Sequence, residues 1–534
     1  MAMNPEKPTV NDRLSGAWDY LLAGRPLLPL AVVWLTTAGH TMNFREMGIG
    51  KGWVSADVYS LHSLYLVCIP LVLLAAPALS RRGSARGLTR LGLALFAAGS
   101  FLNGLDLYGP LPSFLVGRLM AGAGAGMVIY FAPRLLDARW ENPTSWASIL
   151  LPVAGPAVIA GASMVYGWSN WEWGFLMEGA AALLSLIALG SSAGGPRPPA
   201  AGLNYSLAFL PFLAAGSAAV LYCLHWGQLH GWLESLDIVV AVAAGAILPV
   251  IALLLVYPQL DWRALAEGWI RLLLFFFGGV VQFFHGTTMT IYSGLFVNFS
   301  SWQRSWLVWS MPLGVATSLL AARQLMRRWN IALRLPGVVI GLLVLAWGMH
   351  SLHETMLDWP YWQIQNVVDL NWFPAPQHWE LAPGRYLVGL GLGLLMFATD
   401  TMFSPEPDRE ETIRPFLLVA QFFGGGMGMG LLISFLLISH PVQYSYAADR
   451  DYIQAEELAA RRAVLSDALS QAGSSSPERR AEVLEYRTAN YEADNLVYAE
   501  IYATFMTASL CLAGFCSGLF VWNWSRPSPR SVGP

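Results

Sequence analysis

Long apolar runs separated by short polar segments dominate the chain. The run 238-IVVAVAAGAILPVIALLLVY-257 contains no charged residue, and about 20 apolar residues suffice for a helix to cross the hydrocarbon core of a bilayer. A membrane barrel would show short segments of alternating polarity instead. The pattern therefore predicts an all-α, polytopic membrane protein embedded in a lipid bilayer.

Fourteen such runs predict fourteen membrane-spanning helices. The spans are expected at residues 26–44, 56–79, 88–106, 111–133, 146–167, 173–191, 204–226, 236–257, 270–296, 304–323, 335–350, 382–403, 413–439 and 498–524. No small-residue cleavage site follows the first run, so we expect it to remain as a span rather than to act as a signal peptide.

Composition agrees with a membrane protein, and charge orients it. Of the 534 residues, 55% are hydrophobic and 12% are charged, whereas soluble domains carry about 25% charged residues. Lys and Arg concentrate in cytoplasmic loops. Two loops hold such clusters: Arg81, Arg82, Arg86 and Arg90 after the second span, and Arg323, Arg327, Arg328 and Arg334 after the tenth. We therefore expect cytoplasmic termini and an inner-membrane location. No basic tract indicates nucleic-acid binding.

Two patterns occur twice along the chain. The stretch 117-GRLMAGAGAG-126 returns as 384-GRYLVGLGLG-393, and 74-LAAPALSRRG-83 is similar to 320-LAARQLMRRW-329. Parallel repeats of six spans are a known transporter architecture. We therefore expect an N-terminal six-span bundle at 1–195, two inserted spans at 196–262 and a C-terminal six-span bundle at 263–534.

The repeated glycines favour helix packing over phosphate binding. A phosphate-binding loop follows a strand and begins a helix, whereas these glycines lie inside apolar runs. Two pairs are spaced by four residues and so share a helix face that admits a neighbouring backbone; they are Gly122 with Gly126 and Gly389 with Gly393. Arg118 and Arg385 lie on the same faces. A charge there is costly against lipid and should point at protein or at a water-filled cavity, unless the arginine extends to the outer interface.

Several motifs together carry a family resemblance. The loop 76-APALSRRG-83 contains Arg81 and Arg82, and 155-GPAVIAG-161 contains Gly155, Pro156 and Gly161; 227-GQLHGW-232 and 421-QFFGGGMGMG-430 follow. In this order the motifs resemble those of the major facilitator superfamily, in particular its fourteen-span EmrB/QacA-type drug:proton antiporters. The resemblance implies two pseudo-symmetric six-helix bundles, two inserted helices, and proton-coupled drug efflux of the kind that confers multidrug resistance.

The chain departs from this family's pattern at positions tied to proton coupling. Ser80 replaces an aspartate of the loop motif, and His40 stands where the first span normally carries an acid. Ile159-Ala160 replaces a Gly-Gly pair, and Glu172 replaces an arginine between two tryptophans. These changes affect the family's usual route of coupling and leave the expected fold unchanged.

Ionisable residues in the spans are the candidates for proton coupling and transport. The resemblance implies that spans 1, 4, 9 and 12 line the central cavity, which places His40, Arg118, His285 and Arg385 there. Histidine titrates near neutral pH, and Glu178 in the sixth span is a carboxylic acid in apolar surroundings that can exchange a proton. The alternatives are hydrogen-bonded core histidines and an acid at the interface near Trp173.

The ninth span also suggests a substrate pocket. Apolar side chains with a few polar points are typical of ligand sites, and the candidates around His285 are Gln282, Phe284, Met289 and Tyr292. The alternative is that this stripe is core. The His350, His353 and Glu354 cluster lacks the His-Glu-x-x-His spacing of zinc hydrolases, so no metal is expected. We find no cofactor motif and no ATP-binding motif.

One long polar insertion, 441–497, lies on the predicted outer side. Leu458, Leu465 and Leu469 form an apolar stripe, and 473-GSSSP-477 breaks the pattern before a second stripe. Ser476 can cap a new helix that begins at Pro477. We expect a charged helical hairpin, whose stripes either dock a periplasmic adaptor (membrane fusion) protein or pack on each other or on the transporter's rim.

Taken together, these features predict a secondary transporter rather than an enzyme. The expected activity is proton-driven export of an amphipathic or lipophilic small molecule by alternating access. One alternative is a relative that no longer transports and has a structural or assembly role, which Ser80, His40 and Ile159-Ala160 favour. The other is a membrane enzyme acting on lipids, for which only the His350–Glu354 cluster speaks.

Overall fold

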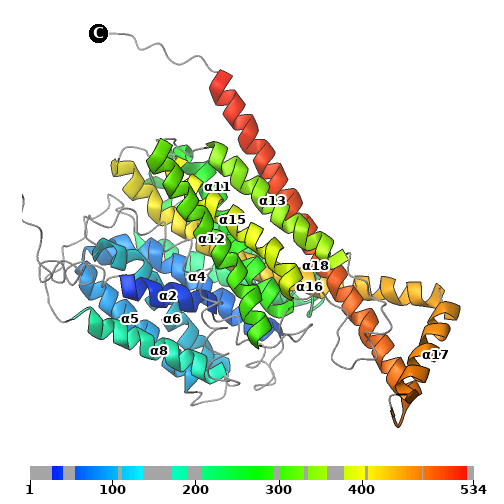
Figure 1. The fold of residues 1–534 in the computed structure, drawn as a ribbon. Helices are drawn as coiled ribbons and strands as arrows, with labels where there is room; N and C mark the ends of the chain where they lie inside the picture. The colour runs from blue at the N-terminus through cyan, green and yellow to red at the C-terminus, as the bar shows by residue number, and fades with distance from the viewer. Residues whose placement is uncertain are drawn as a thin grey trace, which may run out of the picture.

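The structure, a computed structural model, is built almost entirely of helices in the residues that it describes. It describes residues 27–39, 55–105, 111–135, 171–190, 206–292, 301–329, 335–357, 378–402, 407–453, 455–471 and 473–525. The helices of the first part of the chain are α2 (Leu27–Gly39), α4 (Ser55–Ser80), α5 (Ala85–Gly104), α6 (Leu111–Phe131) and α8 (Trp171–Ala188). Figure 1 shows α2, α5, α6 and α8 gathered on one side of the molecule.

The second part of the chain forms the other side (Figure 1). Its helices are α11 (Trp262–Ile291), α12 (Ser301–Trp329), α13 (Leu335–Leu357), α15 (His378–Met402), α16 (Pro407–Ile453), α17 (Ala455–Gln471) and α18 (Pro477–Ser525). Between the two parts come α9 (Leu210–Trp226) and α10 (Leu236–Val256). Short 3₁₀ turns occupy Ala132–Leu135, Leu207–Phe209, Trp232–Glu234 and Tyr257–Gln259.

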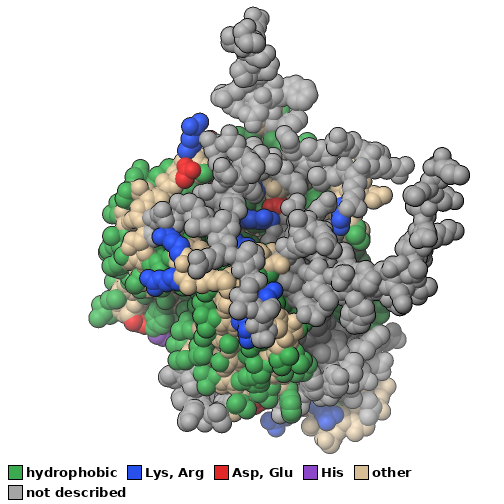
Figure 2. All heavy atoms as spheres, turned by 90° about the vertical axis from the view of Figure 1, so that its left-hand side faces the viewer, with side chains coloured by type: hydrophobic (Ala, Val, Ile, Leu, Met, Phe, Trp, Pro, Cys, Tyr) green, Lys and Arg blue, Asp and Glu red, His purple; other side chains and the backbone are tan. Residues whose placement is uncertain are grey.

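The predicted spans correspond to helices wherever the structure describes them. The fifth, 146–167, lies outside the described residues. Among the helices described, nine are long and apolar enough to cross a membrane by length and composition. Large apolar side chains cover much of the surface, as Figure 2 shows for one face, and α10 is among the most exposed helices, with Val240, Leu254 and Leu236 at its surface. Such a surface suits lipid rather than water.

The glycine faces of α6 and α15 make matching contacts in the two halves. Gly122 lies against the Tyr65 carbonyl oxygen of α4, and Gly389 lies against the Met311 carbonyl oxygen of α12. Gly126 and Gly393 extend the same contacts one turn further, against α4 and α12 respectively. A side chain at these positions would push the neighbouring helix away, which explains the spacing of four residues.

A second repeat, which the sequence analysis missed, lies on the helices that face the other side of α6 and α15. Helix α5 contains 92-GLALFAAG-99 and α13 contains 341-GLLVLAWG-348. A Cβ at Gly124 would collide with the Gly92 carbonyl oxygen, and one at Gly391 would collide with the Gly341 carbonyl oxygen. The close approach of α5 and α6 is thus repeated by α13 and α15.

The inserted pair attaches to the molecule through α9. This helix packs against both α4 and α16, while α10 packs mainly on α9. A buried hydrogen bond of 2.9 Å joins His225 Nε2 of α9 to the Ser63 hydroxyl of α4. Gly430 of α16 lies against Leu224 of α9. Helix α9 therefore contacts both halves where α4 and α16 meet.

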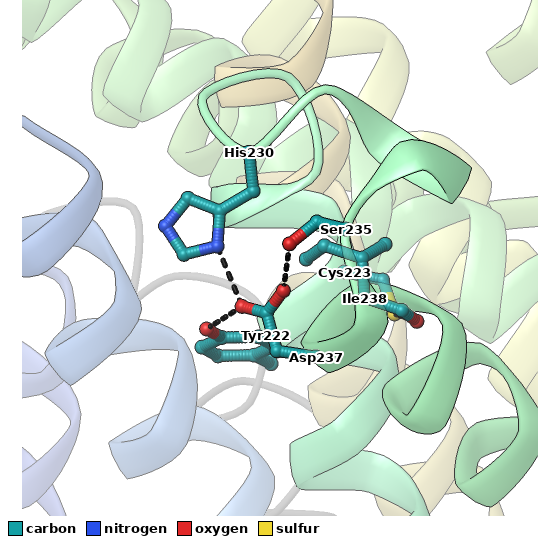
Figure 3. A network of polar contacts seen from close by, with 6 residues as sticks. All are labelled: Tyr222, Cys223, His230, Ser235, Asp237 and Ile238. Carbon is teal, nitrogen blue, oxygen red and sulfur yellow. Dashed lines mark hydrogen bonds and ion pairs between the residues drawn. The ribbon is translucent and has the colours of Figure 1, made fainter.

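A network of hydrogen bonds lies at the connection between α9 and α10 (Figure 3). The Asp237 carboxylate accepts hydrogen bonds from the Tyr222 hydroxyl at 2.7 Å and from His230 Nδ1 at 2.6 Å. The Ser235 hydroxyl donates a third. Because this carboxylate on α10 accepts from α9 and from the connection, it holds the two inserted helices together at this end.

The insertion 441–497 consists of the end of α16, the whole of α17 and the start of α18, and it projects from the rest of the molecule as a hairpin (Figure 1). Helices α16 and α18 continue well past their predicted spans, and α17 packs against the start of α18. Leu465 and Leu469 are buried against Ala481 and Leu484. The two apolar stripes therefore cover each other at these residues, and Leu465 and Leu469 do not form the exposed docking stripe considered from the sequence.

An ion pair joins the two helices α17 and α18 of this hairpin. Arg462 Nη2 lies 2.7 Å from a Glu485 carboxylate oxygen, and Arg462 Nε donates to the same oxygen at 2.8 Å. The hydrogen bond to Glu485 raises the pKa of the Arg462 guanidinium. Because the pair joins α17 to α18, it supports the packing of the leucines one turn away.

Candidate functional site

Arg118 lies in the interior of the first half, on α6. Its side chain is 1% exposed, and its Nη2 donates a hydrogen bond of 3.2 Å to His62 Nδ1 on α4. The guanidinium carbon is 4.5 Å from the centre of the Tyr65 ring and 5.5 Å from that of Phe175. A cation within about 6 Å of an aromatic face is stabilised by the ring's charge distribution. Arg118 therefore points at protein, not at the outer interface.

Glu178 supplies the negative charge of this cluster. It lies on α8, is 4% exposed, and interacts electrostatically with Arg118 and with the Ser100 side chain of α5. The cluster thus draws on α4, α5, α6 and α8. A buried charge is tolerated when an opposite charge compensates it, and Arg118 and Glu178 are both buried and interact with each other.

His62 belongs to this cluster, although the sequence analysis did not select it. Arginine has only donors, so His62 Nδ1 must be the acceptor of their hydrogen bond and carries no proton there. The available signal was an ionisable residue inside the second predicted span, which is a functional candidate by default. The sequence analysis considered His40 instead, which lies outside the described residues.

Arg385 is the counterpart of Arg118 in the second half. Its side chain on α15 is 2% exposed, so it too lies in the interior. Its electrostatic neighbours among the described residues are Tyr502 of α18 and His285 of α11. The rings of His285 and Tyr502 meet edge to face, with centres 5.9 Å apart. Two of the candidates from sequence, His285 and Arg385, are therefore brought together.

The polar atoms of this second cluster are buried and lack hydrogen-bond partners within the part of the chain that is described. They are Arg385 Nε and Nη1, both ring nitrogens of His285, and the Tyr502 hydroxyl. An unpartnered buried donor costs about 1–3 kcal/mol. Several at one place indicate a site whose partner is not part of the described protein.

The predicted pocket residues on α11 are all buried, with varied contacts. The Gln282 side-chain oxygen accepts a hydrogen bond of 3.0 Å from Gln421 Nε2. The Phe284 ring lies 4.5 Å from that of Phe505, and Met289 is fully buried. The Tyr292 hydroxyl donates to Asn495 Oδ1 at 3.0 Å. Phe284 lies beside His285 in sequence and contacts α18 one turn from Tyr502.

A group of buried tyrosines connects the two arginine clusters. Tyr498 of α18 interacts with Tyr59 of α4 and with Tyr502, and its ring meets that of Tyr292 at 5.0 Å. Tyr59 lies one helical turn before His62, and Tyr502 contacts His285. The polar side chains thus form one buried region that crosses from the first half to the second.

Other residues selected from the sequence have structural contacts. His350 Nδ1 is 3.6 Å from a Glu354 oxygen, while His353 Nδ1 donates to the Ala499 carbonyl oxygen at 2.8 Å. Asp400 lies beside the buried Arg271 of α11, whose Nη2 donates to the Asp400 carbonyl oxygen at 3.3 Å. Arg271 was not selected from the sequence, although it lies inside a predicted span.

The loop motif 76-APALSRRG-83 lies at the end of α4 and in the turn that follows it. Arg81 and Arg82 are exposed in the turn after the helix. The buried Ser80 hydroxyl donates to the Pro77 carbonyl oxygen at 2.7 Å, so it is engaged within its own helix. The stretch 155-GPAVIAG-161, with Gly155, Pro156 and Gly161, lies outside the described residues.

Sequence comparisons identify no relative. No protein-family model matches the chain, and no curated protein sequence matches it either.

Solved structures of transporters share the fold. A bacterial homologue of the human lysosomal transporter Spinster, in an inward-facing and occupied conformation, has a TM-score of 0.55 at 13% identity, covering 96% of this chain and 98% of that one. The nucleoside transporter NupG has a TM-score of 0.52 at 9% identity, covering 92% and 99%. A peptide transporter of the POT family has a TM-score of 0.50 at 14% identity, covering 90% and 96%. The chain therefore shares its fold with these three transporter structures.

Proposed function

We propose that this chain is a secondary transporter that exports an amphipathic small molecule in exchange for protons, by alternating access. The observation that carries the proposal is the buried cluster of Arg118, His62 and Glu178 inside a transporter fold. Ionisable residues within membrane spans are rare, face the protein interior and are functional candidates by default. The cluster joins four helices, so a change of charge there acts on their packing.

Glu178 is the proposed proton carrier. Protonation would remove the charge that faces Arg118 and weaken the attraction between α8 and α6, since the Coulomb energy vanishes when one partner is neutral. The bond of Arg118 to His62 and its aromatic contacts do not depend on that charge. A cluster with two such arrangements is what coupling of a proton to a conformational change requires.

Accumulation of dyes in cells tests this proposal. Cells expressing the wild type should accumulate less of at least one amphipathic fluorescent dye, cationic or anionic, and an uncoupler should abolish the difference. Glu178→Gln should abolish export, because the amide cannot exchange a proton. Glu267→Gln, on the exposed end of α11, is the matched control. Export by Glu178→Gln that remains as sensitive to the uncoupler as the wild type would refute the assignment.

The arrangement in the membrane is part of the proposal. We infer fourteen spans, two six-span bundles with α9 and α10 inserted between them, and both termini in the cytoplasm of an inner-membrane protein. The repeated glycine contacts of α6 and α15 support the two bundles. A cysteine at position 86 should resist a membrane-impermeant thiol reagent added outside, once the native cysteines are replaced. Labelling from outside would reverse the orientation.

A structural or assembly role without transport is the second candidate. Ser80 favours this structural role. Its hydroxyl bonds to the Pro77 carbonyl oxygen of its own helix, and it stands where an acid would help to hold the cytoplasmic side closed. If no dye of either charge is exported in a gradient-dependent way, this candidate replaces the first. Because Leu465 and Leu469 are covered inside the hairpin, docking of an adaptor would have to use other faces of residues 441–497.

A further inference from the structure

We propose that Arg385, His285 and Tyr502 bind the oxyanion of an amphipathic organic anion, a carboxylate, phosphate or sulfonate. The inference deepens the proposed function, on which it rests, by naming the substrate class. The three side chains come from α15, α11 and α18 and are at most 2% exposed.

Among the residues that the structure describes, this cluster contains a cation and no acid is recorded as its partner. Among the described residues, the electrostatic neighbours of Arg385 are Tyr502 and His285, and neither is a carboxylate. Arg118 in the first half has Glu178. A buried cation without a counter-ion is costly, and an anionic ligand would supply the missing charge.

The available atoms fit an oxyanion. Arg385 Nε and Nη1 and the Tyr502 hydroxyl are donors without partners in the described protein, and His285 has two ring nitrogens in the same state. Each of these arginine donors can form a charge-assisted hydrogen bond to an oxygen of a carboxylate or phosphate. Neighbouring hydroxyl and imidazole groups can reach the remaining lone pairs.

The surroundings suit an apolar body attached to that anion. Phe284 and Phe505 pack with ring centres 4.5 Å apart, one turn or less from His285 and Tyr502. Tyr292 and Tyr498 lie next along α11 and α18. Ligand sites combine such apolar and aromatic walls with a few polar groups that fix orientation, so an aromatic acid is the probe of choice.

Calorimetric binding to the purified full-length protein in detergent tests the inference. The probes are 2-naphthoate, 2-naphthyl phosphate and naphthalene-2-sulfonate, with the neutral 2-naphthamide as control. We expect saturable binding of at least one anion and at least tenfold weaker binding of the amide. Arg385→Gln should weaken binding about 10–100-fold, since a hydrogen bond to a charged group contributes about 1.5–3 kcal/mol. Tyr502→Phe should weaken it by a smaller factor.

Controls separate the site from general effects. Arg263→Gln removes an exposed arginine of α11 and should bind like the wild type. If Arg385→Gln does not purify as a monodisperse protein, Tyr502→Phe and His285→Gln carry the test. Displacement of 2-naphthoate by phosphatidylglycerol but not by phosphatidylcholine would identify a lipid headgroup as the source of the oxyanion, and no displacement would identify a soluble acid.

The outcomes distinguish this inference from the proposed function. No saturable binding of any of the three anions, equal binding of the amide, or unchanged binding by Arg385→Gln would overturn the anion site, even if a cationic or neutral dye is exported. Binding that depends on Arg385, in a protein that exports nothing, would support the site and refute the transporter.

Discussion

Arg118 and Arg385 occupy equivalent positions of the two repeats and have different surroundings. Each precedes a glycine face, which packs on α4 in the first half and on α12 in the second. The contact of Gly122 with Tyr65 and that of Gly389 with Met311 make Tyr65 the counterpart of Met311. Counting back one turn from these residues makes His62 the counterpart of Val308.

The difference lies in what surrounds each charge. In the first half, α4 offers His62 as an acceptor and Tyr65 as an aromatic face, and α8 offers Glu178. In the second half, α12 offers the apolar Val308 and Met311 at the same places. The helix scaffold is repeated and the chemistry is not. Among the described residues, one arginine has an acid as electrostatic neighbour, and the other has a tyrosine and a histidine, where we propose that an anion binds.

The largest expected effect is loss of the compensated arginine. Arg118→Met leaves Glu178 buried opposite no cation, so it should lower the free energy of unfolding by about 3–5 kcal/mol. The double variant Arg118→Met with Glu178→Leu should recover most of that loss, because it removes both charges. Unfolding in mixed micelles, followed by circular dichroism, measures both. Equal losses in the single and double variants would show that the two charges are not coupled.

The same substitution in the other half should act in the opposite direction. Arg385→Met removes a buried charge that has no acid nearby in the described protein, and fills its place with an apolar side chain. The ligand-free protein should be unchanged or more stable by about 1–4 kcal/mol. The unfolding assay used for Arg118 measures it. A loss as large as that of Arg118→Met would mean that Arg385 has its own protein counter-ion.

The packing of the two halves should respond alike. Gly124→Ala and Gly391→Ala each place a methyl group against a neighbouring backbone, and overpacking costs about 1–3 kcal/mol. Gly514→Ala on α18 is the control, since nothing lies within 4 Å of its added Cβ. The control should be neutral or slightly stabilised. A cost in one half alone would break the equivalence on which the comparison of the arginines rests.

The smallest effects concern single hydroxyl groups. Ser63→Ala removes the buried hydrogen bond to His225 and should cost about 0.5–1.5 kcal/mol. Tyr502→Phe removes a hydroxyl without a partner in the described residues and should be neutral or slightly stabilising in the absence of ligand. Thermal unfolding of both variants beside the wild type measures the difference. A larger loss for Tyr502→Phe than for Ser63→Ala would mean that this hydroxyl is already bonded.

Much of the fold could be predicted from the sequence. A helix satisfies its own backbone hydrogen bonds, and lipid leaves an isolated segment little else to form, so apolar runs predict helices without knowledge of the fold. The repeated glycines also predicted which faces pack closely, because a residue without a side chain leaves one place for a neighbouring backbone. The second glycine repeat, beginning at Gly92 and Gly341, was present in the same sequence and was missed because its two copies share few other residues.

The sites were predicted only in part. Arg118, Glu178, His285 and Arg385 could be selected because a charged or titratable residue in a span is costly and therefore rare. Their grouping could not, since helical periodicity gives the face on which a residue lies but not the helix that meets it. His62 and Tyr502 belong to the two sites because α4 packs beside α6 and α18 lies beside α11 and α15, which the sequence did not reveal. The stripes of the hairpin show the same limit, because Leu465 looks identical in sequence whether it faces a partner or Ala481.

The sequence by itself thus determined the helices, their approximate ends and the duplication of their close contacts, since these depend on apolar length and on side-chain size alone. Only the tertiary structure decided that Arg118 meets an acid and that Arg385 meets a tyrosine and a histidine. The physical reason is that compensation of a buried charge acts across helices. It depends on which side chains lie within a few ångströms after packing, and the order of residues along one helix does not specify that.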